Sequence, residues 1–235
     1  FHVRASYTDE VRRLVQRLAG MGLKDIGIVN LDNAYGREML EDATRFLAEQ
    51  GLKPLVQAAL ATDGKNLSDV LAKVGQARPA AVLLATAGSV SVELVRGLKK
   101  NLPGVLMAGL SVTLTSDGLK QLGDAGSGLA VTMVMPDPNR AKTALVRDYQ
   151  AAMRAKGVQE FNLGTLEAYV NTRVLAEGLE RAGRELTRGK LRSALASLRS
   201  HDMGGMTVDF SSGAPYVGSR FVDLGILGAN GRVVG

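Results

Sequence analysis

The sequence predicts an α/β fold with a doubly wound, mainly parallel sheet, and two observations carry that prediction. Over the first 135 residues, short apolar segments alternate with longer segments whose apolar residues recur at helical spacing. Five apolar segments separated by four amphipathic ones are typical of a parallel sheet that is covered on both faces. Right-handed crossovers between parallel strands make such a unit doubly wound.

The elements of this region follow one another in a regular order. The first helix carries Val11, Leu14, Val15 and Leu18 on one face and ends at Gly20. The predicted strands are 25–30, 55–60, 80–85, 105–108 and 129–135. The predicted helices between them are 36–50, 67–74, 90–98 and 116–122.

After residue 135 the alternation stops. Pro136-Asp137-Pro138 disfavours both helix and strand and therefore indicates a crossover. Three helices, 140–156, 164–182 and 188–199, follow with no predicted strand between them, so this segment supplies no sheet for their apolar faces. The tail predicts an antiparallel hairpin of 207–210 and 220–227.

Composition excludes several classes of protein. The chain has 235 residues, 46% hydrophobic and 22% charged, with no cysteine and no apolar run near the ~18 residues that cross a membrane. The net charge is +6, and the densest basic run spans residues 181–192. This run lacks interleaved aromatic residues, so we interpret it as solvated cations at a helix end and expect no nucleic-acid partner. The first residue is Phe1, and we expect that a targeting segment has been removed.

The residue types that catalysis needs are scarce. His2 and His201 are the two histidines; neither has a second histidine at metal-ligand spacing, and neither indicates a catalytic triad. No glycine-rich dinucleotide fingerprint follows the first strand, and no phosphate loop occurs, so a nucleotide-dependent enzyme is disfavoured. We therefore expect binding without catalysis, with no cofactor and no metal.

The segment Asp32-Asn33-Ala34-Tyr35-Gly36 lies between the first predicted strand and the helix after it. In an open α/β sheet, ligands bind outside the carboxyl ends of the strands. The start of the helix adds unpaired backbone N–H groups and a partial positive charge. Such a turn suits a small anionic or zwitterionic ligand on which Tyr35 packs. The alternative is an ordinary turn in which Asp32 or Asn33 only caps the helix.

Two further turns leave neighbouring strands at the same edge. Thr86-Ala87-Gly88-Ser89 leads into a helix whose N–H groups can receive a carboxylate, and the turn 109–113 contains the hydroxyl of Ser111. The alternative is that small residues merely permit tight turns here. The predicted ligand-binding residues of the three turns are Asp32, Asn33, Tyr35, Thr86, Ala87, Ser89 and Ser111.

Motifs spread along the whole chain carry a resemblance to a known family. They are Asp32-Asn33-Ala34-Tyr35-Gly36, Arg78-Pro79-Ala80-Ala81-Val82, Gly128-Leu129-Ala130-Val131, Leu166-Glu167-Ala168-Tyr169, Gly204-Gly205 and Gly218-Ser219-Arg220-Phe221-Val222. In their order and spacing the chain resembles the periplasmic solute-binding proteins of amino-acid ABC transporters, of the type I leucine/isoleucine/valine-binding kind.

This resemblance implies two α/β lobes joined by three crossovers, with a solute bound between them and buried by hinge closure. Residues 4–135 would form the second lobe, 136–204 the returning helical part of an incomplete first lobe, and 205–235 the final crossover and hairpin. The resemblance also implies a periplasmic protein without enzymatic activity whose precursor has a signal peptide. Its partners would be an amino acid or a similar small carboxylate and the membrane permease of the transporter.

The chain departs from the family pattern because the first strands of the first lobe are missing, so we expect a fragment. Leu145, Tyr149, Tyr169 and Leu175 should then be exposed in a monomer or covered by self-association. A ligand-sensing domain of a transcriptional or signalling regulator with the same fold is the alternative function.

The turn after the fourth strand differs from that of some family members. They place an acidic residue near it to meet the amino group of the ligand, whereas Gly109-Leu110-Ser111-Val112 contains none. The sequence therefore leaves room for a carboxylate or another small polar compound in place of an α-amino acid.

Overall fold

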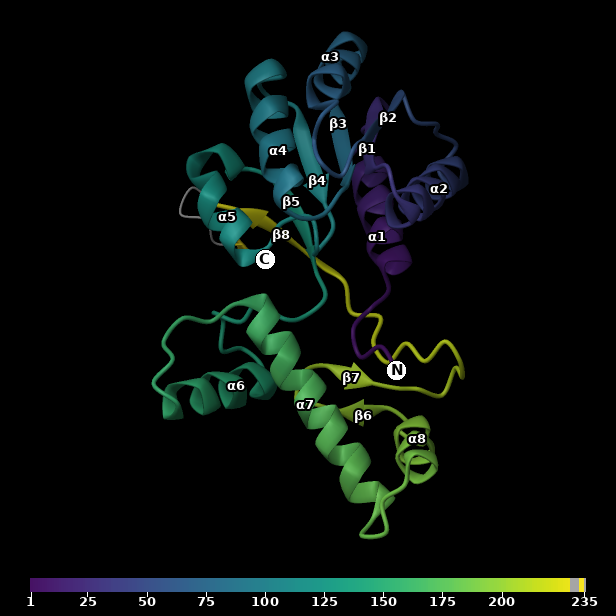
Figure 1. Cartoon of the computed structure of the whole chain (residues 1–235), viewed down its shortest axis with the longest axis vertical. Helices are drawn as coiled ribbons and strands as arrows, with labels where there is room; N and C mark the ends of the chain where they lie inside the picture. The colour runs from purple at the N-terminus through teal and green to yellow at the C-terminus, as the bar shows by residue number, and fades with distance from the viewer. Residues whose placement is uncertain (229–232, 235) are drawn as a thin grey trace. The chain divides into compact units, whose positions relative to one another are not determined.

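The computed structural model describes residues 1–228 and 233–234, and the chain divides into two compact units (Figure 1). The sheet unit consists of Tyr7–Met133 and Leu224–Gly235, and the helical unit of Phe1–Ser6 and Val134–Asp223. The backbone therefore passes from one unit to the other after Ser6, after Met133 and after Asp223.

The sheet unit contains a seven-stranded sheet with the order β2-β1-β3-β4-β5-β8-β9. Its strands are β1 (Ile26–Leu31), β2 (Val56–Leu60), β3 (Ala81–Ala85), β4 (Leu106–Gly109), β5 (Ala130–Met133), β8 (Asp223–Leu227) and β9 (Val233–Val234). The first five pair in parallel, whereas β8 and β9 pair antiparallel. The predicted α/β class with a mainly parallel, doubly wound sheet is thus confirmed.

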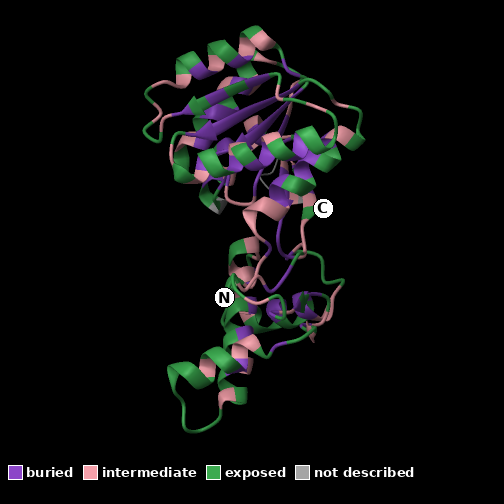
Figure 2. Ribbon diagram, turned by 90° about the vertical axis from the view of Figure 1, so that its right-hand side faces the viewer, coloured by how far each residue is buried: buried purple, intermediate pink, exposed green. Residues whose placement is uncertain are grey.

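Helices cover both faces of this sheet. The helices are α1 (Tyr7–Gly20), α2 (Ala34–Glu49), α3 (Leu67–Ala77), α4 (Ser89–Asn101) and α5 (Ser116–Leu122), followed by the short 3₁₀ helix η1 (Gly123–Gly126). Successive residues of a strand serve the two faces: Ile28 packs with α1 and α2, and Val29 packs with α3 and α4. Every residue of β1 and β3 is buried, as expected of central parallel strands (Figure 2).

Helix α2 begins against the end of β1, and this close approach requires a glycine. A Cβ atom on Gly36 would lie 2.0 Å from the backbone oxygen of Leu31. Asn33 caps the same helix, because its Oδ1 accepts a hydrogen bond of 2.8 Å from the N–H of Gly36. The backbone of the turn after β1 is therefore held both by the close approach of Gly36 to Leu31 and by the Asn33 cap.

The helical unit has an apolar core of its own. Its elements are α6 (Ala144–Ala155), α7 (Leu163–Ala182), α8 (Arg188–Ala196), β6 (His201–Asp202) and β7 (Thr207–Val208). Met203, Met206 and Phe210 from the segment after α8 pack with the helices, as does Ala5 from the N-terminal segment. This segment supplies the apolar cover that the helix pattern alone did not reveal.

The expectation that Leu145 and Tyr149 are exposed is wrong. Both are completely buried in this core, and the Tyr149 hydroxyl lies 2.5 Å from that of Thr165. Tyr169 is half-buried, whereas Leu175 is 46% exposed, as expected. The apolar surface of these helices is therefore divided between a closed core and an exposed strip on α7 that consists of Leu175 and Leu179.

The predicted hairpin of the tail is also wrong. β7 pairs antiparallel with β6, and β8 joins the large sheet beside β5. The two segments belong to different units of the chain. A pattern of alternating apolar residues marks a strand correctly but does not specify which strand it pairs with.

Replacing Gly36 by alanine should destabilise the sheet unit by about 1–3 kcal/mol, because the new Cβ has no space beside Leu31. Gly20→Ala is the control, since nothing lies within 4 Å of a Cβ at that helix end. Urea unfolding followed by circular dichroism measures both. Equal midpoints for the two variants would show that the α2 start is not tightly fixed.

Two leucines of the helical unit provide a second comparison. Leu145→Ala should cost about 2–5 kcal/mol, because the side chain is fully buried and leaves a cavity. Leu175→Ala should cost under about 1 kcal/mol, because this side chain is 46% exposed. Equal free energies of unfolding in the two variants would contradict the described core.

Candidate functional site

The candidate site lies where the strand order of the sheet reverses. β1 and β3 are neighbours in the order β2-β1-β3-β4-β5, so the chain after β1 turns toward one side of the sheet and the chain after β3 toward the other. Such a switch point leaves a crevice at the carboxyl ends of the two strands. The register pairs Asn30 with Ala85, so the turns that follow these strands start at the same level.

The side chains of the turn after β1 differ in whether they already take part in a helix cap, an ion pair or a ring contact. Asn33 uses Oδ1 as the helix cap, which leaves its amide Nδ2 as the donor of that side chain. Asp32 is exposed and pairs at 3.2 Å with Arg37 in the first turn of α2. Tyr35 is half-buried, and its ring meets that of Tyr7 edge to face at 5.4 Å. Tyr7 begins α1, and no sequence pattern had indicated that it lies beside Tyr35.

The turn after β3 begins with a buried residue and ends with exposed ones. Thr86 is completely buried, and its Oγ1 accepts a hydrogen bond of 2.9 Å from Ser91. Ala87 is half-buried, whereas Gly88 and Ser89 are exposed at the start of α4. Gly88 occupies the N-cap position with a φ of 81°, which favours glycine, and it has no side chain that could cap the helix. Thr86 is therefore enclosed, and Gly88 and Ser89 are the solvent-exposed residues of this turn.

The turn after β4 is held by a residue that the sequence analysis missed. Ser111 donates its backbone N–H to Glu10 Oε2 at 2.8 Å and its hydroxyl to Glu10 Oε1 at 3.1 Å. Thr132 on β5 donates a third hydrogen bond to Glu10 Oε2. Glu10 is completely buried although it is an acid. An acidic residue one helical turn before Leu14, on the apolar face of α1, was the signal that could have identified it.

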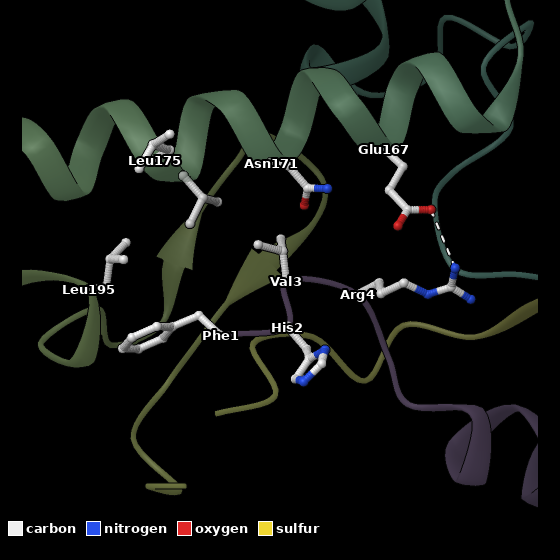
Figure 3. A pocket seen from close by; sticks show the side chains of 9 residues that line it. Phe1, His2, Val3, Arg4, Glu167, Asn171, Leu175 and Leu195 are labelled. Atoms are coloured by element: carbon white, nitrogen blue, oxygen red, sulfur yellow. Dashed lines mark hydrogen bonds and ion pairs between the residues drawn. The ribbon is translucent and has the colours of Figure 1, made fainter. Parts of the chain in front are cut away.

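A groove of about 330 Å³ lies in the helical unit and contains none of the predicted site residues (Figure 3). Phe1, Val3, Leu175 and Leu195 give it an apolar lining. The side chain of Arg4 extends toward Glu167 of α7, with 3.5 Å between Nη1 and Oε2. The groove thus combines an apolar wall with one ion pair.

Within residues 1–228 and 233–234, no three or more histidine or acidic side chains gather as a metal site would require. None of the helices in these residues combines the length and the apolar character needed to cross a bilayer.

Known proteins share this architecture. The family model described as periplasmic binding protein matches residues 1–219. A substrate-binding periplasmic protein from Ralstonia solanacearum shares 30% identity with a TM-score of 0.86, over 100% of this chain and 67% of that chain. No match is found among curated proteins.

Two more distant structures share the fold. A branched chain amino acid ABC transporter protein from Thermus thermophilus with bound valine has 19% identity and a TM-score of 0.79, over 97% of this chain and 64% of that one. A solute binding protein of an ABC transporter from R. palustris in complex with benzoate has 15% identity and a TM-score of 0.80, over 98% and 62%. The chain thus spans about two thirds of the length of the structures it matches.

Variants of Asn33 separate its capping role from ligand contact. Asn33→Ala should cost about 1 kcal/mol of stability through the lost cap, whereas Asn33→Asp should keep the cap and the stability. If Nδ2 donates to a bound carboxylate, Asn33→Asp should still weaken binding, because it replaces the donor by an anion. Urea unfolding and ligand titration measure the two effects. Unchanged binding in Asn33→Asp would limit Asn33 to capping.

Proposed function

The chain belongs to the periplasmic binding protein family, and we propose that it forms part of an extracytoplasmic substrate-binding subunit of an ABC transporter. Its solute would be an amino acid or a similar small polar carboxylate, and its partner the transporter's membrane permease. In this proposal the protein binds its solute by closure of two lobes and catalyses no reaction. The observation that carries the proposal is the reversal of the strand order between β1 and β3, beside which the turns after β1, β3 and β4 leave the same edge of the sheet.

The chemistry of the turns supports a solute with a carboxylate. The exposed start of α4 has a glycine at its N-cap, so its first N–H groups suit a bound anion. The Nδ2 donor of Asn33 lies on the neighbouring turn. Tyr35, supported by the ring of Tyr7, offers an aromatic surface for the rest of the solute.

The ligands of the structural relatives agree with this class. Valine and benzoate are both small molecules with one carboxylate, one with an ammonium group and one with an aromatic ring. We propose a periplasmic location and the ABC permease as partner on the same basis. Self-association would cover the exposed strip that includes Leu175.

A thermal-shift screen tests the proposed function. The panel contains L-leucine, L-alanine and L-phenylalanine, the three acids that lack only their amino group (4-methylpentanoate, propanoate and 3-phenylpropanoate), and benzoate. A true ligand at a hundred times its Kd should stabilise the protein by about 2.7 kcal/mol. The assay uses the complete gene product. No stabilisation by any member would contradict the proposed solute class.

Tyr35→Ala should weaken binding of the ligand by on the order of tenfold, because it removes an aromatic surface at the crevice. Tyr169→Ala is the matched control, since Tyr169 is also half-buried and its ring also makes an edge-to-face contact, with Tyr149 at 5.7 Å. Isothermal titration calorimetry gives both Kd values. Equal losses in the two variants would argue against the crevice as the binding site.

A further inference from the structure

The first turn of α1 lies beside the start of α2, and two tyrosines meet there. Tyr7 is the first residue of α1, and Tyr35 is the second residue of α2. Their ring centroids are 5.4 Å apart at an interplanar angle of 77°, so the edge of one ring meets the face of the other. Both side chains are half-buried and pack against the same apolar cluster on one face of the sheet. The ring of Tyr35 thus has a neighbour from a distant part of the chain.

The turn after β1 fixes the backbone of Tyr35 but not the direction of its side chain. The Asn33 cap and the close approach of Gly36 to Leu31 hold the main chain on either side of this residue. A tyrosine side chain still has more than one staggered χ1 rotamer, and each rotamer points the ring in a different direction. An edge-to-face contact favours one ring orientation, because the positive edge of one ring is attracted to the negative face of the other. Tyr7 therefore supplies an orientation that the turn itself does not determine.

Tyr7 can hold another ring in place because the start of α1 is itself joined to α2. The hydroxyl of the next residue, Thr8, donates a hydrogen bond of 2.6 Å to Oδ2 of Asp42 on α2. One helical turn further along, the Arg12 guanidinium lies 4.4 Å from the centroid of the buried Phe46 ring. These two contacts join successive turns of α1 to α2. They restrict movement of the Tyr7 ring relative to the start of α2.

An aromatic side chain that is oriented before the solute arrives binds it more tightly than a mobile one. A side chain that becomes ordered only on binding loses rotamer freedom, and this loss reduces the affinity. A ring whose orientation is already fixed avoids the loss. The contact between Tyr7 and Tyr35 fixes such an orientation within the protein itself.

We propose that Tyr7 is a positioning residue, which holds the ring of Tyr35 in the orientation that contacts the solute. Tyr7 acts through Tyr35 and does not itself touch the solute. The inference rests on the proposed function and deepens it, because it assigns part of the affinity to a residue outside the three turns at the switch point. It follows that the contribution of Tyr7 to affinity disappears when the Tyr35 ring is absent.

A double-mutant cycle in the complete gene product tests this dependence. Isothermal titration calorimetry measures the Kd of the panel member that stabilises the protein most. Tyr7→Leu removes the ring but keeps an apolar side chain, and it should raise the Kd about three- to tenfold, as expected for one aromatic pair. Tyr7→Phe keeps the ring and should stay within about twofold of the wild-type Kd. In the Tyr35→Ala background, Tyr7→Leu should change the Kd by less than about twofold.

A matched control and a second measurement make the result specific. Tyr169→Leu should leave the Kd unchanged, although Tyr169 is also half-buried and its ring also makes an edge-to-face contact, with Tyr149 at 5.7 Å. The second measurement needs no variant and decides if Tyr7→Leu fails to fold. Three-bond NMR couplings to Cγ of Tyr35 in the solute-free wild-type protein should show a single χ1 rotamer.

The outcomes separate this inference from the proposed function. If Tyr7→Leu leaves the Kd unchanged, or raises it by the same factor with and without the Tyr35 ring, the role of Tyr7 is overturned and the proposed function stands. Couplings averaged over several χ1 rotamers of Tyr35 overturn that role as well. If no member of the panel binds, the proposed function is overturned, and this inference with it. A Kd that Tyr7→Leu raises only when the Tyr35 ring is present supports the inference.

Discussion

Burial of the parallel sheet on both faces is the constraint on which the rest of the sheet unit depends. β1 and β3 have no exposed residue, so every strand position is committed to one of two apolar cores. Because the first five strands are parallel, the turns that follow them leave at one edge. Polar side chains that could bind a solute are therefore concentrated in those turns.

The same constraint explains why the class of fold was predictable. Apolar strands alternating with amphipathic helices determine a covered parallel sheet, and Asn33, Gly36 and Gly88 indicate where the turns lie. These features are local, and each is visible within a few residues of sequence. The three helices after residue 140 were predicted for the same reason.

What the sequence did not reveal depends on contacts between distant segments. β8 pairs within the large sheet and not with β7, and Leu145 and Tyr149 are covered by residues that follow α8. The hydrogen bonds that Glu10 accepts from Ser111 and Thr132 join residues that are 101 and 122 positions apart. Neither composition nor periodicity carries information about such pairs, because both describe only neighbours along the chain.

The site shows this limit most clearly. Tyr35 could be selected from its place in one turn, but its aromatic partner Tyr7 comes from another helix. Ser111 could be selected as a hydroxyl, but its hydrogen bond to a buried acid from another helix was not visible in the sequence. The chemical character of the crevice is thus a property of the folded sheet unit as a whole.

The central claim is that the carboxyl edge of this sheet, at the β1/β3 switch point, is the solute site. The most direct measurement is an NMR titration of the ¹⁵N-labelled protein with the member of the panel that stabilises it most, in which each backbone amide is followed. The account predicts that the largest shifts occur at 32–36, 86–89 and 110–113, the three turns at the switch point. Shifts confined to the groove around Phe1–Arg4 and α7, or the absence of any shift, would contradict it.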